Sequence, residues 1–211
     1  MSEMYKQYRK GWLEVISGCM FAGKTEELIR RIKVLEYAYQ NVLVFKPRID
    51  NRYSDTKVAS HAGSMVDSII IDHASEIMNY VDCSIDVVAI DEVQFFDDDV
   101  IEVCDYLARN GIRVMVAGLD MDFRGEPFGV MPRLLTEAEF VTKLTAVCVQ
   151  CGAPATRTQR IVNGKPASWN DPLIVVGAKE NYEARCRHCH KVLDKPTKLD
   201  APFGNFQGKK D

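Results

Sequence analysis

The sequence predicts an α/β protein with a mainly parallel central sheet and a small second module near the C-terminus. Two observations carry this prediction: short apolar runs alternate with helical patterns, and two Cys-x-x-Cys pairs frame a segment of different texture after about residue 146. Strands that alternate with helices are typical of parallel sheets with right-handed crossovers. We therefore expect an α/β domain over residues 11–145, a cysteine-bearing module over residues 146–192 (the cysteine module), and tails over residues 1–10 and 193–211.

The expected strands are short, rich in Val and Ile, and alternate little between faces, which is typical of a sheet covered on both sides. They are expected at residues 12–16, 42–45, 69–71, 86–90 and 113–117. Helical patterns occupy residues 24–39, 74–81 and 98–109, and in the third we expect Ile101, Tyr106 and Leu107 to face inward. Residues 46–67 are polar and lack apolar periodicity, which favours a long functional loop that could act as a lid.

Composition narrows the class of protein. The 211 residues are 46% hydrophobic and 27% charged, which is enough for one sizeable core. The net charge of −3 is spread over interspersed residues without a basic block, which disfavours a DNA or RNA partner. No stretch approaches the roughly 20 apolar residues that span a bilayer, and residues 1–12 lack a signal-peptide core, so we expect a cytoplasmic protein without a membrane partner.

Residues 18–25 read GCMFAGKT and match the phosphate-loop pattern G-x-x-x-x-G-K-[ST] between an expected strand and an expected helix. Backbone N–H groups and the helix N-terminus would surround the phosphates, Lys24 would reach the β- and γ-phosphates, and Thr25 would bind Mg²⁺. The alternative is a glycine turn before a helix. We predict that a nucleoside triphosphate binds here, contacted by Gly18, Cys19, Met20, Phe21, Ala22, Gly23, Lys24 and Thr25.

Two carboxylates, Asp91 and Glu92, follow the expected strand at residues 86–90. Ligands bind at the carboxyl ends of strands in doubly wound sheets, so both side chains are expected near the triphosphate. Asp91 would join the Mg²⁺ shell. Glu92 would then accept the proton of a substrate hydroxyl as its oxygen attacks the γ-phosphate. Solvated turn residues after a strand are the alternative interpretation.

Aromatic side chains follow two strand ends. Phe95 and Phe96 come directly after the acid pair, and Phe123 and Phe128 lie in residues 119–129, which read LDMDFRGEPFG. Apolar enclosure and stacking on aromatic faces are how proteins hold a flat nucleobase. We predict a base pocket beside the γ-phosphate, with ordinary core packing as the alternative for each ring.

The two Cys-x-x-Cys pairs, Cys148 with Cys151 and Cys186 with Cys189, supply four thiolates with the spacing of a structural zinc site. A redox dithiol is an alternative, and His188 or His190 could replace Cys189 as the fourth ligand. The remaining cysteines, Cys19, Cys83 and Cys104, are expected to pack as small hydrophobic side chains.

With this loop, the D-E-x-Q-F-F run, the L-D-x-D-F-R-G-E-P-F-G segment and the split cysteine pairs in this order, the chain resembles the zinc-containing thymidine kinases of the bacterial and cytosolic type over about residues 11–192. The resemblance implies a RecA-like phosphate-loop domain, a small zinc-ribbon-like lasso over the base, ATP as donor and thymidine as acceptor. It also implies a homotetramer and feedback inhibition by dTTP.

The resemblance also implies roles for single residues. Glu92 corresponds to the general base, Lys24 to the loop lysine, and Thr25 and Asp91 to the Mg²⁺ side. Further implied ATP contacts are Asp91, Gln94, Arg52 and Arg160, the two arginines having solvated surface positions as their alternative. Implied nucleoside contacts are Met20, Phe95, Leu119, Phe123, Phe128, Thr158, Tyr182 and the backbone of Val175, Val176 and Gly177. Cys19 stands where relatives commonly carry Pro, and Ala22 stands where they often carry Ser. We expect phosphate binding to survive both changes.

These features together predict a kinase that transfers the γ-phosphate of ATP to the 5′-hydroxyl of thymidine, giving dTMP and ADP. One alternative is a RecA-like ATPase whose zinc-containing module docks a partner. Another is an ATP-binding scaffold without catalysis, which is hard to reconcile with the intact set of Lys24, Thr25, Asp91 and Glu92.

Overall fold

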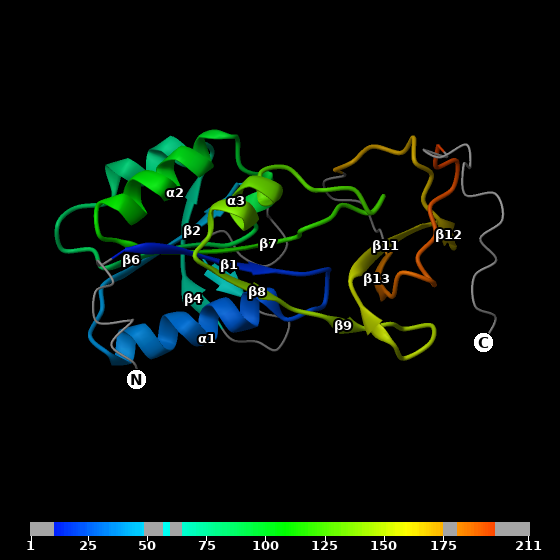
Figure 1. Cartoon of the computed structure of the whole chain (residues 1–211), viewed down its shortest axis with the longest axis horizontal. Coiled ribbons are helices and arrows are strands. Elements are labelled where there is room, and N and C mark those ends of the chain that lie inside the picture. Colours follow the sequence, from blue (N-terminus) through cyan, green and yellow to red (C-terminus); the bar gives the residue numbers. More distant parts are fainter. Residues whose placement is uncertain (1–10, 49–56, 60–64, 175–180, 197–211) are drawn as a thin grey trace.

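A computed structural model of the chain describes residues 11–48, 57–59, 65–174 and 181–196. Its centre is a sheet of six strands in the order β5-β2-β6-β7-β1-β8 (Figure 1), and every pairing within it is parallel. The predicted α/β fold with a mainly parallel sheet is therefore confirmed. The strands are β1 (Trp12–Ser17), β2 (Val42–Pro47), β5 (Ile69–Ile71), β6 (Val87–Ile90), β7 (Arg113–Gly118) and β8 (Phe140–Lys143).

Both faces of this sheet are buried. Successive side chains of a strand point to opposite faces, and in β6 Val88 and Ile90 join one apolar cluster while Val87 and Ala89 join another. All four of these side chains are fully buried. The first cluster packs against helices α2 (Asp99–Arg109) and α3 (Met131–Glu137), and the second packs against α1 (Lys24–Tyr37), which covers the opposite face (Figure 1).

Several elements differ from the predicted patterns. The segment from Ala74 forms a 3₁₀ helix, η2 (Ala74–Asn79), where we expected a longer α-helix. In α2, Ile101 and Leu107 are buried as expected, but the prediction for Tyr106 is wrong because this side chain is 55% exposed. The buried stripe of α2 passes through Cys104 one turn before Leu107, and Tyr106 lies off that stripe. Helix α3 and the edge strand β8 were not predicted.

The segment at residues 46–67, which we expected to be a loop, contains part of the sheet. Strand β2 continues to Pro47, and a short antiparallel pair forms between β3 (Lys57–Ala59) and β4 (Met65–Asp67). Residues 49–56 and 60–64 lie outside the described part of the chain. Arg52, a candidate ATP contact, falls among them, so its predicted position is not tested.

The cysteine module consists of short antiparallel strands beyond one end of the central sheet (Figure 1). Strand β9 (Ala146–Val147) pairs with β10 (Pro154–Ala155), and β11 (Arg157–Val162) pairs with both β12 (Lys165–Pro166) and β13 (Asn181–Arg185). Two residues with positive φ, Asn163 at 50° and Gly164 at 75°, close the β11–β12 hairpin. Asn-Gly suits such a turn because both residues tolerate the left-handed conformation.

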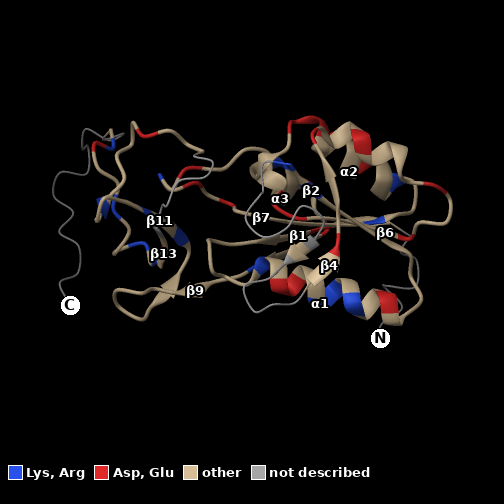
Figure 2. Cartoon of the chain, turned by 180° about the vertical axis from the view of Figure 1, so that it is seen from behind, with Lys and Arg blue, Asp and Glu red and all other residues tan. Residues whose placement is uncertain are grey.

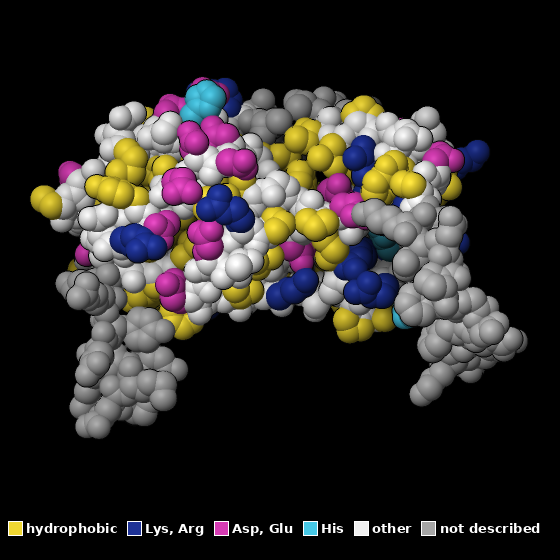
Figure 3. All heavy atoms as spheres, turned by 45° about the horizontal axis from the view of Figure 1, so that its top comes forward, with side chains coloured by type: hydrophobic (Ala, Val, Ile, Leu, Met, Phe, Trp, Pro, Cys, Tyr) yellow, Lys and Arg dark blue, Asp and Glu magenta, His cyan; other side chains and the backbone are white. Residues whose placement is uncertain are grey.

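Charge is mixed over the described helices. Figure 2 shows acidic and basic residues interleaved along α1. On the face that carries α2 and α3, acidic side chains gather over the start of α2 (Figure 3). Asp98 and Asp99 stand at the N-terminus of this helix, where their negative charges stabilise the positive end of the helix dipole. Within the described residues, no helix combines the length and the apolar character that a membrane crossing would require.

Candidate active site

The phosphate loop, residues 18–25, connects β1 to α1. Gly18 has φ of 151°, and a Cβ there would come within 2.6 Å of the carbonyl oxygen of Leu144, so the position requires glycine. The Lys24 ammonium donates to the Cys19 carbonyl oxygen at 2.9 Å and therefore lies back over the loop. Burial of this ammonium lowers the pKa of Lys24, while the carboxylates of Glu92 and Asp91 act in the opposite direction. The loop thus has one cation beside two carboxylates.

Asp91 is buried at the end of β6 and accepts a hydrogen bond from the Thr25 hydroxyl at 3.0 Å. Burial first, and then the neighbouring Glu92 carboxylate, raise the pKa of Asp91 above its ordinary value. A divalent cation would stabilise the ionised form that burial disfavours, and carboxylate and hydroxyl oxygens are the ligands that Mg²⁺ prefers. Thr25 and Asp91 therefore fit a Mg²⁺ site in their chemistry.

Glu92 has left-handed backbone angles, φ 51° and ψ 38°, which are uncommon for a residue with a long side chain. Its N–H donates to the Asp91 carboxylate at 3.0 Å, and its own carboxylate accepts from the side-chain amide of Gln94 at 2.5 Å. The Gln94 amide oxygen in turn accepts from the Leu119 N–H at 3.0 Å. Strained backbone held by several hydrogen bonds is common at functional sites.

Residues 119–129 form a compact loop after β7, the 119–129 loop. The Asp122 carboxylate accepts from the N–H groups of Arg124 and Glu126, both at 2.9 Å, and the Phe128 N–H donates to the Asp120 carbonyl oxygen. Lys143 pairs with the buried Asp120 carboxylate at 2.7 Å. These contacts fix the loop that carries the candidate base pocket.

The candidate pocket aromatics occupy two places. Phe95 is half-buried and meets the buried Phe128 edge to face, with ring centroids 5.6 Å apart. Phe123 is buried, and the guanidinium groups of Arg124 and Arg160 lie 5.3 and 5.0 Å from its ring centroid. Phe123 therefore packs toward the cysteine module, and Phe95 with Phe128 lies nearer the acid pair.

Strand β11 places two candidate residues in different surroundings. The Thr158 hydroxyl is buried and accepts from the Met20 N–H of the phosphate loop at 3.1 Å. The Arg160 side chain is buried, with its guanidinium over Phe123 and donating to the Pro172 carbonyl oxygen. Tyr182 is half-buried on β13, in register with Arg160. The predicted contacts Val175, Val176 and Gly177 lie outside the described residues.

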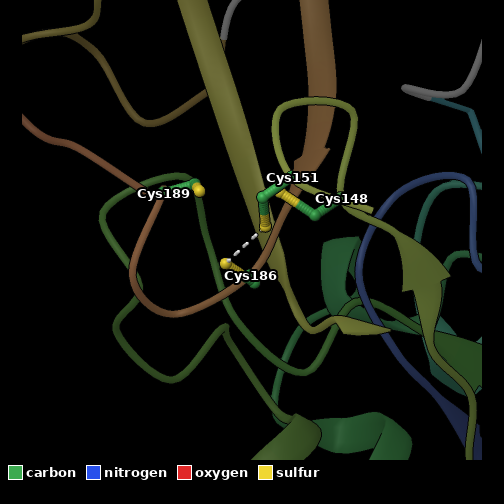
Figure 4. A group of neighbouring side chains, drawn as sticks. All are labelled: Cys148, Cys151, Cys186 and Cys189. Carbon is green, nitrogen blue, oxygen red and sulfur yellow. Dashed lines mark hydrogen bonds between the residues drawn. The ribbon is translucent and has the colours of Figure 1, made fainter. Parts of the chain in front are cut away.

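Four thiols converge where β9 and β13 end (Figure 4): their sulfur atoms all lie within 4.8 Å of one another, and those of Cys151 and Cys186 are 3.6 Å apart. Sulfur atoms around a tetrahedral Zn²⁺ at about 2.3 Å would be about 3.8 Å apart, so the set has the dimensions of a Cys₄ zinc site. Desolvation opposes ionisation of Cys148, but backbone hydrogen bonds from Cys186, Gln150 and Cys151 outweigh it and lower the pKa of Cys148 to about 6.

The predicted alternatives for the fourth ligand occupy other positions. A ring nitrogen of His190 lies 2.9 Å from the carbonyl oxygen of Phe123, and His188 is exposed. Cys189 belongs to the converging set. The donor set among the described residues is therefore four sulfurs, which fits a structural zinc ion with no open coordination position.

The chain's sequence decides the family. The sequence model of the thymidine kinase family matches residues 11–190. The chain belongs to the thymidine kinase family. Membership in the thymidine kinase family supports a nucleoside kinase function in the broad sense. Among solved structures, the ATPase DotB of Legionella pneumophila is 16% identical over 62% of this chain, with a TM-score of 0.39, and the chain spans 35% of the DotB chain.

In this thymidine kinase family member, the phosphate loop also contacts the cysteine module in a way that the sequence did not predict. Cys19 of the phosphate loop is buried and shares an apolar cluster with Cys148 and Cys186, and its thiol lies 3.3 Å from the Ala155 carbonyl oxygen. The expectation that Cys19 packs as a small hydrophobic side chain is confirmed, as it is for the buried Cys104, but Cys83 is exposed and the same expectation is wrong there. The spacing of the cysteines gave no signal that the phosphate loop touches the two Cys-x-x-Cys pairs.

Proposed function

We propose that this chain is an ATP:thymidine 5′-phosphotransferase that converts thymidine and ATP to dTMP and ADP. The observation that carries the proposal is the junction of the phosphate loop with the acid pair: Thr25, at the start of α1, is bonded to Asp91 at the end of β6, and Glu92 is adjacent. Family membership supports a nucleoside kinase, and thymidine is the acceptor that the sequence resemblance implies.

On the donor side, the loop N–H groups and Lys24 would bind the β- and γ-phosphates. Thr25 and Asp91 would hold Mg²⁺, which when bound supplies charge neutralisation to the phosphate oxygens. Lys24 now donates to the Cys19 carbonyl oxygen, and a phosphate oxygen would replace that acceptor. The lysine side chain would rotate away from the Cys19 carbonyl oxygen to make this exchange.

On the acceptor side, Glu92 would accept the proton of the 5′-hydroxyl. The 5′-oxygen then forms its bond to the γ-phosphorus as the bond to the bridging oxygen of ADP breaks. Positioning contributes most of the rate in such transfers, since little covalent chemistry falls to the protein. We assign the base pocket to Phe95, Phe128 and Phe123, with Leu119 and Met20 as apolar contacts.

The cysteine module would close over the nucleoside, with residues 11–145 as the donor domain and residues 146–192 as the lasso. Thr158 can serve both parts, because a hydroxyl that accepts from the Met20 N–H still has its own hydrogen to donate. We extend the resemblance to Tyr182, Val175, Val176 and Gly177 as nucleoside contacts, and to Arg52 and Arg160 near the phosphates. A homotetramer, inhibition by dTTP and a cytoplasmic location belong to the same proposal.

A panel of nucleosides tests the proposal. The purified chain is incubated with γ-labelled ATP, Mg²⁺ and one of thymidine, deoxyuridine, deoxycytidine or deoxyadenosine, and labelled products are separated. We expect labelled dTMP and little label on deoxyadenosine. Release of labelled inorganic phosphate without an acceptor would favour the alternative, a RecA-like ATPase with a zinc-containing interaction module.

A further inference from the structure

The side chain of Gln94 joins two strand ends of the candidate site. It lies in the short 3₁₀ helix η3 (Val93–Phe95) after β6 and is 3% exposed. Its amide nitrogen donates to Oε2 of Glu92 at 2.5 Å, and its amide oxygen accepts from the Leu119 N–H at the end of β7 at 3.0 Å. One side chain therefore connects Glu92, the candidate general base, to the start of the 119–129 loop.

The surroundings of Gln94 leave this amide little freedom. Its oxygen lies 2.6 Å from where a Cβ on Gly118 would stand, and its own backbone carbonyl lies 2.7 Å from the corresponding point on Gly129. Both neighbouring glycines thus give room to Gln94. The resemblance to the family implied an ATP contact for this residue, but its amide is engaged at both ends within the protein.

The carboxylate of Glu92 benefits from such a partner for a geometric reason. A glutamate side chain has three rotatable bonds, and holding one carboxylate in a single orientation costs side-chain entropy. A short amide hydrogen bond to one oxygen fixes the orientation, and a carboxylate can still accept a proton on its second oxygen. A general base must lie within hydrogen-bond reach of the hydroxyl that it deprotonates, and small misplacements are costly.

The bond to Leu119 adds a reference point. Leu119 is half-buried and follows Gly118, the last residue of β7. Because β6 and β7 are adjacent and parallel, their carboxyl ends lie at the same edge of the sheet, and Gln94 bridges them there. The Glu92 carboxylate is thereby fixed relative to the loop that would carry the nucleoside.

We propose that Gln94 is a positioning residue that orients the Glu92 carboxylate toward the acceptor hydroxyl. This inference rests on the proposed kinase function. Its effect on turnover is exerted through Glu92, and neither ATP nor the nucleoside needs to touch the amide.

The test compares Gln94→Met and Gln94→Leu with the unchanged chain, loaded with zinc, using thymidine and ATP. Both replacements remove the two hydrogen bonds at similar volume but pack differently, so a shared effect comes from the loss of the amide. We expect kcat to fall about 10- to 100-fold, the scale of a misplaced catalytic group. The affinity for ATP, measured by calorimetry without a nucleoside, should stay within about threefold of the unchanged chain's. The substitution leaves the residues of the phosphate loop unchanged.

A double-mutant cycle separates positioning from packing. In a Glu92→Ala background, Gln94→Met should change the residual kcat less than about twofold, because the carboxylate that Gln94 orients is gone. Three results would each overturn the inference. They are a fall of about 10- to 100-fold in the residual kcat when Gln94→Met is added to Glu92→Ala, a kcat change below about threefold in the single variants, and a loss of ATP affinity as large as the loss of kcat. If the unchanged chain forms no labelled dTMP, the proposed function fails first, and that result is distinct from all of these.

Discussion

Replacing Thr158 by Val tests the contact that joins the phosphate loop to the cysteine module. The Thr158 hydroxyl is the acceptor for the Met20 N–H at 3.1 Å, and the threonine is 3% exposed. Valine has the same shape without an acceptor, so the variant leaves a backbone donor unsatisfied beside the loop. Leaving such a donor unpaired costs about 1 to 3 kcal/mol, and the lower half of that range applies because the pair is only partly buried.

The cost should appear in both stability and ATP affinity. We expect Thr158→Val to lower the free energy of unfolding by about 1 to 2 kcal/mol in urea titrations followed by tryptophan fluorescence. If the released loop adopts its binding conformation less often by the same free energy, the dissociation constant for ATP rises about 5- to 30-fold.

The matched control is Thr158→Ser, which loses a methyl group and keeps the acceptor. Losing the methyl group costs about 1 kcal/mol of stability through lost apolar burial, but ATP affinity should stay within about twofold. If Thr158→Val binds ATP as tightly as the unchanged chain, or if both variants lose ATP affinity equally, the Thr158 hydroxyl does not hold the loop in its binding conformation.

Three further outcomes follow from the structure. Two arginines of α1, Arg30 foremost, lower the pKa of Glu27 from 4.5 to about 2, so Glu27→Gln should lower the free energy of unfolding by about 0.5 to 1 kcal/mol at pH 7. Urea titrations should show this difference shrinking as pH falls from 4.5 toward 2, and a constant difference would contradict the prediction. Leu107→Ala should lower the free energy of unfolding by about 2 to 5 kcal/mol because Leu107 is 1% exposed. Tyr106→Ala, at an exposed position of the same helix, should change it by less than about 0.5 kcal/mol, and equal losses would mean that α2 is packed differently. Removing zinc with a chelator should weaken ATP binding as well as nucleoside binding in calorimetry, because Cys19 shares its cluster with two of the zinc-site thiols; an unchanged ATP affinity would separate the loop from the metal.

The sign of the Glu27 effect follows from the direction of its pKa shift. A carboxyl whose pKa is lowered in the folded state stabilises that state only while it is ionised. The contribution is therefore fully present above 4.5, the value in the unfolded chain, and is lost as pH falls through about 2. The pair is discounted to a surface value because the Arg30 side chain is 63% exposed.

Local pattern was sufficient for five of the six strands of the central sheet, and β8 is the exception. The strand at residues 69–71 was predicted with the bounds of β5, and the phosphate loop lies between β1 and α1 as the motif requires. Such runs are recognisable because a strand buried on both faces has no polar alternation to confuse it. Edge strand β8 was missed because Phe140 and Val141 are partly exposed and the run has no such pattern.

Contacts between distant segments could not be predicted in the same way. Nothing in the spacing of Gln94 and Leu119 indicates that an amide joins them, because the contact depends on β6 and β7 being neighbours. The same holds for Met20 and Thr158, which lie 138 positions apart and meet only when the cysteine module docks on the loop. Sequence alone supplies the chemical groups, and the strand order determines which of them meet.

The proposed function requires Glu92 to deprotonate a nucleoside hydroxyl beside ATP that is held by the phosphate loop. Its most direct test compares the unchanged chain with Glu92→Gln in single-turnover transfer from γ-labelled ATP to thymidine, with ATP affinity measured separately. We expect labelled dTMP from the unchanged chain, about 10²- to 10⁴-fold slower transfer in the variant, and an ATP affinity within about threefold of the unchanged chain's. Near-normal transfer by Glu92→Gln would contradict it.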